Sequence, residues 1–224
     1  MFTDFQNAIS SGDLEAIFGS LLGQIIIIVI GLGLLLFAVG FAGNKKGEKV
    51  NVKALTYSSI AIAIGFVLSK IELFALPQGG SITPFSMLFI IIIGYFFGVR
   101  TGVLAGIVFG LLKLALGGYV FAPIQILLDY PLAFGALGLS GLFANQKYGL
   151  IKGIIIGSFG RFICHFISGV VFFGQWAPEG WNSVIYSMWY NFSYVGVEGV
   201  ATAILVSIPV VATAFNQVKK RAIA

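Results

Sequence analysis

Long apolar stretches alternate with short polar connections along the chain. The apolar segments fall at residues 16–42, 54–76, 84–97, 101–116, 122–144, 150–173 and 183–215. The run FGSLLGQIIIIVIGLGLLLFAVGFAG in the first segment exceeds the ~20 residues that a helix needs to cross a bilayer. Backbone groups in lipid must be hydrogen-bonded internally, and the segments lack the strict alternation of a membrane barrel. The pattern therefore predicts an all-α integral membrane protein.

Composition supports this class. Hydrophobic residues make up 58% of the chain and charged residues 9%, with a mean hydropathy of +1.02. A soluble domain carries about 25% charged residues. The chain has a single cysteine, Cys164, and a single histidine, His165. These counts exclude an intrachain disulfide and a metal site built from Cys and His clusters, and we expect no cofactor.

Positive charge gathers in alternate connections. Ten of the thirteen Lys and Arg residues lie near 43–53, 98–101, 145–152 or in the tail: Lys45, Lys46, Lys49, Lys53, Arg100, Lys147, Lys152, Lys219, Lys220 and Arg221. The other connections carry only acidic charges: Asp4, Asp13, Glu15, Glu72 and Glu179. Cytoplasmic loops hold the Lys/Arg excess. We therefore expect a multi-pass protein of the bacterial cell membrane, with the N-terminus outside, the C-terminus in the cytoplasm and no nucleic-acid partner.

The first apolar segment could instead be a cleaved signal peptide, with AVG at 38–40 as its cleavage site. The residues before it are acidic rather than basic, and the run is too long for a signal core. We favour an uncleaved extra transmembrane helix within residues 1–43. A basic cytoplasmic linker at 44–53 would follow it, and a basic cytoplasmic tail would occupy residues 217–224.

A few ionisable side chains interrupt the apolar segments, and such residues are functional candidates in a membrane. Lys70 and Lys113 lie near helix ends, where a long side chain can reach the interface. Asp129 lies about two turns into its helix, beside Pro131, whose ring should kink that helix. A carboxylate beside a kink suits a pocket for a polar or cationic ligand, although a capping or structural carboxylate would give the same pattern.

Residues four apart share a helix face. Two such rows occur, one on each of the last two segments: Arg161, His165, Gly169 and Phe173; and Tyr186, Tyr190, Tyr194 and Glu198. Arg161 and Glu198 fall at similar depth, so we expect them to form a structural ion pair beneath a pocket. A lone membrane histidine is ordinarily a core residue, but His165 leads along its face to the aromatic loop FFGQWAPEGW. An aromatic cavity with one carboxylate suits a flat organic cation.

Catalytic motifs are missing from the sequence. It contains no Walker A sequence, HExxH or nucleophile elbow, so the chain cannot hydrolyse nucleotide by itself. His165 with Ser168 could serve an intramembrane hydrolase, but no oxyanion arrangement accompanies them. The sequence therefore favours a binding or transport protein over an enzyme, with no catalytic residue.

The stretches IQILLDYPLAFGALGLSGL, RFICHFISGVVFFGQWAPEGWNSVIYS and YNFSY closely resemble the thiamine-specific S components, the substrate-binding subunits of energy-coupling factor (ECF) transporters. The resemblance covers about residues 54–216. It implies a six-helix membrane bundle that captures extracellular thiamine and delivers it with a transmembrane coupling subunit and two cytoplasmic ATPases. The first 43 residues have no counterpart there, so the expected fold is this six-helix S-component bundle plus one extra N-terminal transmembrane helix.

The resemblance also assigns substrate-binding residues. Asp129 matches the acidic residue that holds the aminopyrimidine, with Tyr130 beside it, and His165 matches the histidine near the ring system. The further matching positions are Tyr119, Arg161, Gly169, Tyr186 and Asn191. Some relatives have Trp at the position of Phe173, so Trp176 or Trp181 could supply the stacking here. Phe74 could serve as the aromatic residue of the first outer loop.

Small residues at helix-packing spacing have two interpretations. Ser59 and Ala63 match a small-residue face that the family uses to contact the coupling subunit, although packing within the bundle is the alternative. For Gly102, Gly106 and Gly110 we expect packing within the bundle.

Two other functions remain open. The protein could be an S component for another vitamin or for a thiamine precursor such as hydroxymethylpyrimidine, because Asp129 suits any aminopyrimidine. It could also be a secondary transporter that moves protons through Asp129, His165 and Glu198.

Overall fold

The computed structural model describes residues 2–11, 16–17, 20–23, 25–26, 29 and 51–224. The described N-terminal part contains helix α1 (Phe2–Ser11). The predicted membrane helix within residues 1–43 and the basic linker at 44–53 fall largely outside the described residues.

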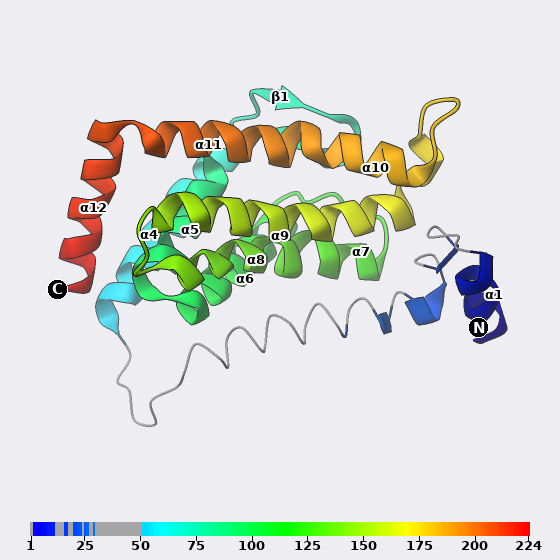
Figure 1. Ribbon diagram of the computed structural model, residues 1–224, viewed down its shortest axis with the longest axis horizontal. Coiled ribbons are helices and arrows are strands. Elements are labelled where there is room, and N and C mark those ends of the chain that lie inside the picture. The colour runs from blue at the N-terminus through cyan, green and yellow to red at the C-terminus, as the bar shows by residue number, and fades with distance from the viewer. Residues whose placement is uncertain (1, 12–15, 18–19, 24, 27–28, 30–50) are drawn as a thin grey trace.

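Helices form nearly all of the described chain after residue 51 (Figure 1). The first three are α4 (Val52–Ser69), α5 (Ser86–Phe97) and α6 (Val99–Ala115). A continuous rod follows, made of α7 (Pro123–Leu127), the π-helical turn η2 (Leu128–Leu132), α8 (Ala133–Ala136) and η3 (Leu137–Phe143). Next come α9 (Gly149–Phe172) and a second rod of α10 (Ser183–Asn191), η5 (Phe192–Gly196, again a π turn) and α11 (Val197–Ser207). The last helix is α12 (Pro209–Ile223).

Several of these helices have the length and hydropathy of membrane spans. Within the described residues, three pass this test: 52–69, 123–143 and 149–172. The rod 183–207 and α12 count as a fourth if taken together, although the chain bends by 86° between them at Ile208. The expectation of an all-helical membrane protein is therefore confirmed.

The second apolar segment ends earlier than its hydropathy predicts. The helix stops at Ser69, and residues after it form a small hairpin in which β1 (Phe74–Ala75) pairs antiparallel with β2 (Ser81–Ile82). A single 3-10 turn, η1 (Pro77–Gly79), joins the two strands. Pro77 and the glycines after it cannot sustain a helix, which is why the chain turns here.

Helix α5 forms the centre of the bundle. Met87, Ile90, Ile91 and Ile93 are fully or almost fully buried, and α5 packs against α4, α6, η3 and α9. A helix that is apolar on all sides is buried on all sides. A single residue, Gly98 at φ +89°, connects α5 to α6.

The glycine row of α6 packs inside the bundle, as expected. A Cβ on Gly106 would collide with the Phe134 carbonyl, and one on Gly110 with the Tyr130 carbonyl. These glycines let α6 lie directly against the rod that carries Asp129.

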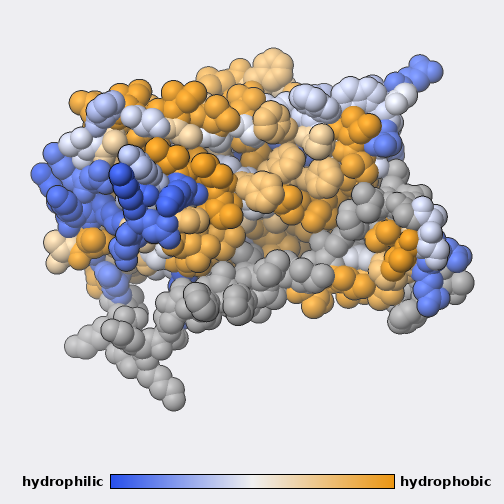
Figure 2. Space-filling view, viewed as in Figure 1, coloured by the Kyte–Doolittle hydropathy of each residue, from blue (hydrophilic) through white to orange (hydrophobic). Residues whose placement is uncertain are grey.

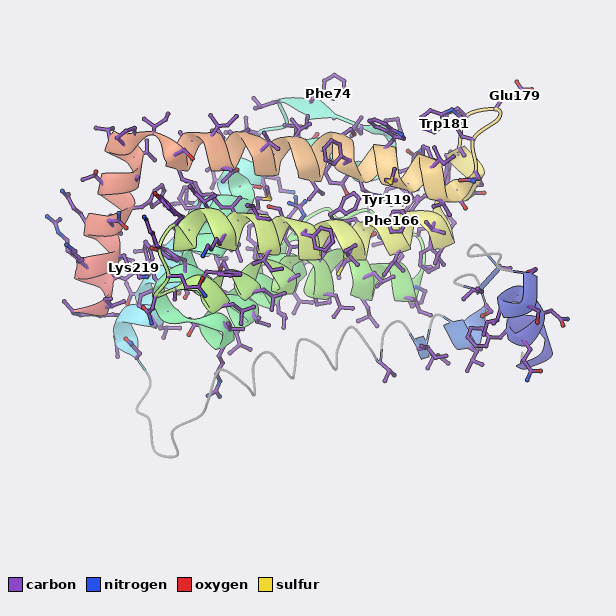
Figure 3. All side chains as sticks on the ribbon, viewed as in Figure 1. Phe74, Tyr119, Phe166, Glu179, Trp181 and Lys219 are labelled. Carbon is purple, nitrogen blue, oxygen red and sulfur yellow. The ribbon has the colours of Figure 1, made fainter. Side chains whose placement is uncertain are left out.

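Among the described residues, Lys219 of the basic set and Glu179 of the acidic set lie at opposite ends of the molecule (Figure 3). Hydrophilic residues gather around α12 at one end, while apolar residues cover most of the flank (Figure 2). Lys219 in α12 lies 3.7 Å from the Tyr95 ring centre and donates to the Ala144 carbonyl, which ties α12 across the end of the bundle. Glu179 and Trp181 lie at the far end (Figure 3).

Candidate ligand-binding site

A cavity of about 390 Å³ opens among the hairpin region, α6, the rod 123–143, α9 and α10. This volume lies within the range of small-molecule pockets. Nine of the predicted substrate-binding residues line it: Tyr119, Asp129, Tyr130, Arg161, His165, Gly169, Phe173, Tyr186 and Asn191. The structure therefore brings together side chains that are up to 72 residues apart in the sequence.

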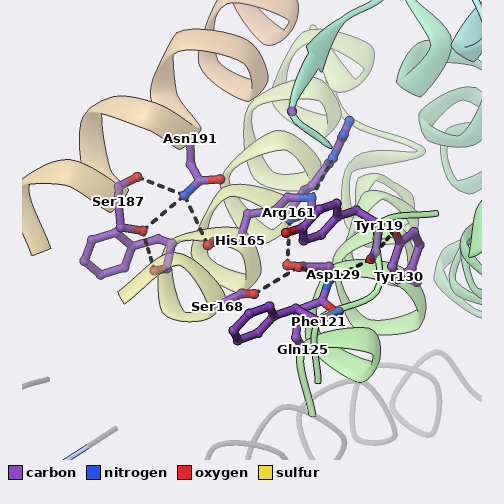
Figure 4. A network of polar contacts seen from close by, with 12 residues as sticks. Tyr119, Phe121, Gln125, Asp129, Tyr130, Arg161, His165, Ser168, Ser187 and Asn191 are labelled. Atoms are coloured by element: carbon purple, nitrogen blue, oxygen red, sulfur yellow. Dashed lines mark hydrogen bonds and ion pairs between the residues drawn. The ribbon is translucent and has the colours of Figure 1, made fainter. Parts of the chain in front are cut away.

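Asp129 is the polar centre of the site (Figure 4). Its Oδ1 lies 2.9 Å from His165 Nδ1, and its Oδ2 accepts hydrogen bonds from Gln125 Nε2 at 2.7 Å and Ser168 Oγ at 3.0 Å. The Asp129 and His165 side chains are 13% and 11% exposed. The π turn η2, which contains Asp129 and Pro131, brings the carboxylate between α7, which carries Gln125, and α9, which carries His165 and Ser168. Such turns are frequent at functional sites.

The hydrogen bonds define the tautomer of His165. Arg161 Nε donates to His165 Nε2 at 3.3 Å, so Nε2 must be the unprotonated nitrogen. Nδ1 then carries the hydrogen and donates it to Asp129. The imidazole is therefore neutral, and Asp129 is held by three neutral donors.

The predicted ion pair between Arg161 and Glu198 is wrong. Among the described residues, Glu198 Oε1 instead lies 3.0 Å from Thr83 Oγ1 and 3.3 Å from Ser86 Oγ, and accepts from the Met87 N–H at 3.3 Å. Glu198 thus occupies the N-terminus of α5, where free N–H groups attract a carboxylate and no side chain of α5 caps the helix. It does not line the cavity.

Arg161 is held in a different way. Its guanidinium lies 4.7 Å from the centre of the Phe134 ring, and Nη1 lies 3.8 Å from Met87 Sδ. The side chain is 6% exposed and faces the cavity. The Phe134 ring face and His165 Nε2 take the place of the Glu198 carboxylate that we predicted as the partner of Arg161.

Aromatic rings form the wall opposite the acid. The Phe173 ring lies 5.9 Å from Tyr119, 5.8 Å from Phe121 and 5.5 Å from Trp176, between ring centres. Trp176 is not a lining residue; it packs behind Phe173 and supports it. Phe74, another candidate, is 60% exposed on the outer side of the hairpin (Figure 3).

Gly169 and Asn191 line the cavity and also lie at the contact between α9 and α10. A Cβ on Gly169 would collide with Ser187 Oγ. Asn191 Nδ2 donates to the His165 carbonyl at 3.1 Å, and its Oδ1 accepts from Tyr194 at 2.9 Å. These contacts hold α10 against the part of α9 that carries the histidine.

The segment between β1 and β2 lies over the cavity. Tyr186 donates to Gln78 Oε1 at 3.3 Å, the Gly80 N–H donates to the Tyr190 hydroxyl at 3.1 Å, and that hydroxyl donates to the Pro77 carbonyl. Gln78 has a φ of +60° in this turn. The tyrosine row of α10 thus reaches the hairpin, and the cavity is covered on that side.

Several lining or supporting residues were not predicted. Gln125, Ser187 and Gln78 contact the predicted site residues Asp129, Asn191 and Tyr186, and Ser168, considered only for a hydrolase, donates to the carboxylate. A signal for Gln125 exists in the sequence, since it precedes Asp129 by four and is polar within an apolar run. In the part of the chain that the structure describes, no group of three or more His, Cys, Asp or Glu side chains could hold a metal ion.

A bundle of apolar helices that encloses a polar, aromatic-walled cavity defines a membrane protein that binds a small molecule. The family model described as thiamine transporter protein (Thia_YuaJ) matches residues 55–217, and the chain belongs to this family. It is 34% identical to the thiamine transporter ThiT of Bacillus subtilis over 177 residues, covering 72% of this chain and 91% of that protein. It is 39% identical to ThiT of Lacticaseibacillus paracasei over 121 residues, covering 46% and 60%.

Structure comparison agrees. A solved ThiT chain from Listeria monocytogenes matches with a TM-score of 0.61 and 28% identity, covering 72% of this chain and 97% of that chain. The family is one of transporters, so the expectation that the protein is not an enzyme is confirmed.

Proposed function

We propose that the protein captures thiamine from outside the cell and serves as the substrate-binding subunit of an ECF transporter. Membership of the thiamine transporter family supports this function. The structural observation that carries it is the Asp129 carboxylate, held inside an aromatic-walled cavity with only neutral hydrogen-bond donors around it.

Thiamine matches this site in its chemistry. Its aminopyrimidine offers N–H donors to a carboxylate, and its thiazolium ring carries a positive charge that aromatic faces attract. Asp129 supplies the carboxylate, and Phe173 with Tyr119 supplies ring faces on the opposite wall. His165 can orient the acid because Arg161 fixes its tautomer.

Delivery into the cell requires partners and an orientation. The basic end around α12 faces the cytoplasm in this proposal, so the cavity opens toward the outside. The chain has no nucleotide-binding motif, so two cytoplasmic ATPases and a transmembrane coupling subunit would supply the energy. The extra helix within residues 1–43 would add a membrane span to the six-helix bundle.

The coupling subunit would contact the face of α4 that carries Ser59 and Ala63. Both residues are exposed, whereas the neighbouring small residues Ala61 and Gly65 are buried inside the bundle. A bulky Ala63→Trp side chain should therefore abolish uptake in cells that contain the complete transporter, while thiamine binding by the purified protein is unchanged. Loss of both activities would show a folding defect and would contradict the assignment of this face.

Thiamine titration of the detergent-purified protein, followed by tryptophan fluorescence, tests the binding function. We expect saturable, stoichiometric quenching without an energy source. Asp129→Asn should raise Kd by about 10- to 100-fold, the effect of losing a charge-assisted hydrogen bond. Glu179→Gln makes the same chemical change on an exposed loop residue and should leave Kd unchanged.

Other outcomes would identify other functions. Quenching by a hydroxymethylpyrimidine fragment but not by thiamine would indicate a precursor transporter. Uptake by this protein alone in liposomes, driven by a pH gradient, would indicate a proton-coupled transporter and would contradict the subunit role.

A further inference from the structure

Gln125 connects the acid of the site to its aromatic wall. The residue is 1% exposed and all of its polar atoms are hydrogen-bonded to groups around the cavity. Its Nε2 donates to Asp129 Oδ2 at 2.7 Å and to the Tyr119 carbonyl at 3.2 Å, and its Oε1 accepts from the Phe121 N–H at 3.0 Å. Figure 4 shows this amide between the carboxylate and the loop.

The position of Gln125 explains how one side chain reaches both groups. Pro123 starts α7 and the N-cap residue Ala122 has no side-chain cap, so Gln125 is the third residue of the helix. A Gln at this position can reach back to the N–H groups that precede a helix. Asp129 lies one turn further along the same face.

The loop that Gln125 holds carries Tyr119, which lines the cavity, and Phe121, which does not line it but contacts the wall residue Phe173. Tyr119 and Phe121 both pack on Phe173, at 5.9 and 5.8 Å between ring centres. The Tyr119 carbonyl also accepts from the Tyr130 hydroxyl at 2.9 Å. The backbone of the loop is therefore fixed by side chains of the rod 123–143, and Gln125 is the residue that also bonds the acid.

An amide is needed here, since the site requires an N–H donor pair and an acceptor within one side chain. A Glu would place a second carboxylate beside Asp129 and an acceptor against the Tyr119 carbonyl. A Met of similar length would keep the packing but leave the Phe121 N–H without this partner.

We propose that Gln125 is a positioning residue for thiamine, which sets the distance between the Asp129 carboxylate and the aromatic wall formed by Tyr119 and Phe173. This inference rests on the proposed function. The residue acts through Asp129 and the loop, so its loss weakens ligand binding more than it weakens the fold, and it does so mainly by speeding dissociation.

A double-mutant cycle of Gln125→Met and Asp129→Asn tests the proposal. Thiamine Kd and dissociation rate are measured for the wild type, both single variants and the double variant, together with the melting temperature of each ligand-free protein. Gln125→Met should raise Kd by about 10- to 100-fold in the wild-type background. It should change Kd less than about threefold in the Asp129→Asn background, because the group that it positions is already lost.

Two further variants keep the test decisive. Gln146→Met changes an exposed glutamine whose Oε1 accepts from Lys152, remote from the cavity, and should leave Kd unchanged. Ser168→Ala removes the other donor to Asp129 Oδ2 and should raise Kd in the same direction, which provides a readout if Gln125→Met does not fold.

The outcomes separate the two proposals. Unchanged Kd in Gln125→Met, or the same fold-change in both backgrounds, would overturn the positioning role while leaving thiamine binding by the wild type intact. Absence of thiamine binding by the wild type would overturn the proposed function itself.

Discussion

Gly169→Ala should disturb the site through helix packing rather than through direct loss of a ligand contact. An added methyl group would overlap Ser187 Oγ and would lie 2.9 Å from Ser187 Cβ and 3.0 Å from Asn191 Nδ2. These two side chains hold the α9 backbone. Ser187 Oγ donates to the Phe166 carbonyl at 2.6 Å, and Asn191 Nδ2 donates to the His165 carbonyl at 3.1 Å. The methyl group must therefore displace α10 or break these bonds.

The expected loss follows from the overlap. Forcing an extra methyl into packed structure costs about 1–3 kcal/mol. For a chain of this size that corresponds to a melting temperature lower by roughly 2–12 °C. Because the displaced bond ends at the backbone of His165, thiamine binding should weaken as well, by about tenfold for each 1.4 kcal/mol that the shift costs.

A compensating variant provides the control. Ser187→Gly removes both atoms that the new methyl group meets most closely, so Gly169→Ala with Ser187→Gly should be more stable than the sum of the single losses predicts. Melting of the detergent-purified proteins and thiamine titration are the measurements. A Gly169→Ala protein as stable as the wild type, or a double variant with additive losses, would refute the packing argument.

Two more predictions follow from the geometry. The stability losses of Glu198→Gln and Thr83→Val, measured by melting, should be non-additive, with a coupling energy of at least about 0.5 kcal/mol. The reason is that Glu198 Oε1 and Thr83 Oγ1 lie 3.0 Å apart at the α5 N-terminus. Additive losses would contradict this contact. Trp176→Phe should remove most of the thiamine-induced fluorescence change, because Trp176 packs against the cavity-wall residue Phe173. Trp189→Phe should retain this change, because Trp189 is 56% exposed on α10. The reverse pattern would place the ligand elsewhere.

Local spacing in the sequence predicted much of the site. Arg161, His165, Gly169 and Phe173 repeat every four residues and all line the cavity, the first three from α9 and Phe173 from the residue that follows it. This row could be predicted because a helix fixes the direction of its own side chains. The same regularity led to the correct inference that Asp129 and the tyrosines of α10 face the same cavity.

Partners across the bundle could not be predicted from depth alone. Glu198 bonds Thr83, which is 115 residues away and lies in the connection before α5. Nothing in the hydropathy pattern indicated that Phe85, at φ +60°, would leave the start of that helix without a side-chain cap. Trp176 was predicted to bind the substrate; the turn after α9 places it against Phe173 and outside the residues that line the cavity.

The hydrogen-bond partners of Asp129 predict a preference for a cationic ligand. In the described residues, no Lys or Arg forms an ion pair with this carboxylate, and the histidine that bonds it is neutral. Three neutral donors satisfy part of its hydrogen-bonding capacity but leave its negative charge without a bonded cation. The cavity therefore suits a ligand with a positive charge, whereas an uncharged pyrimidine would supply only hydrogen bonds to the carboxylate. We expect thiamine to bind more tightly than its pyrimidine half, because the thiazolium adds a cation that the aromatic rings and the negative charge of Asp129 both attract.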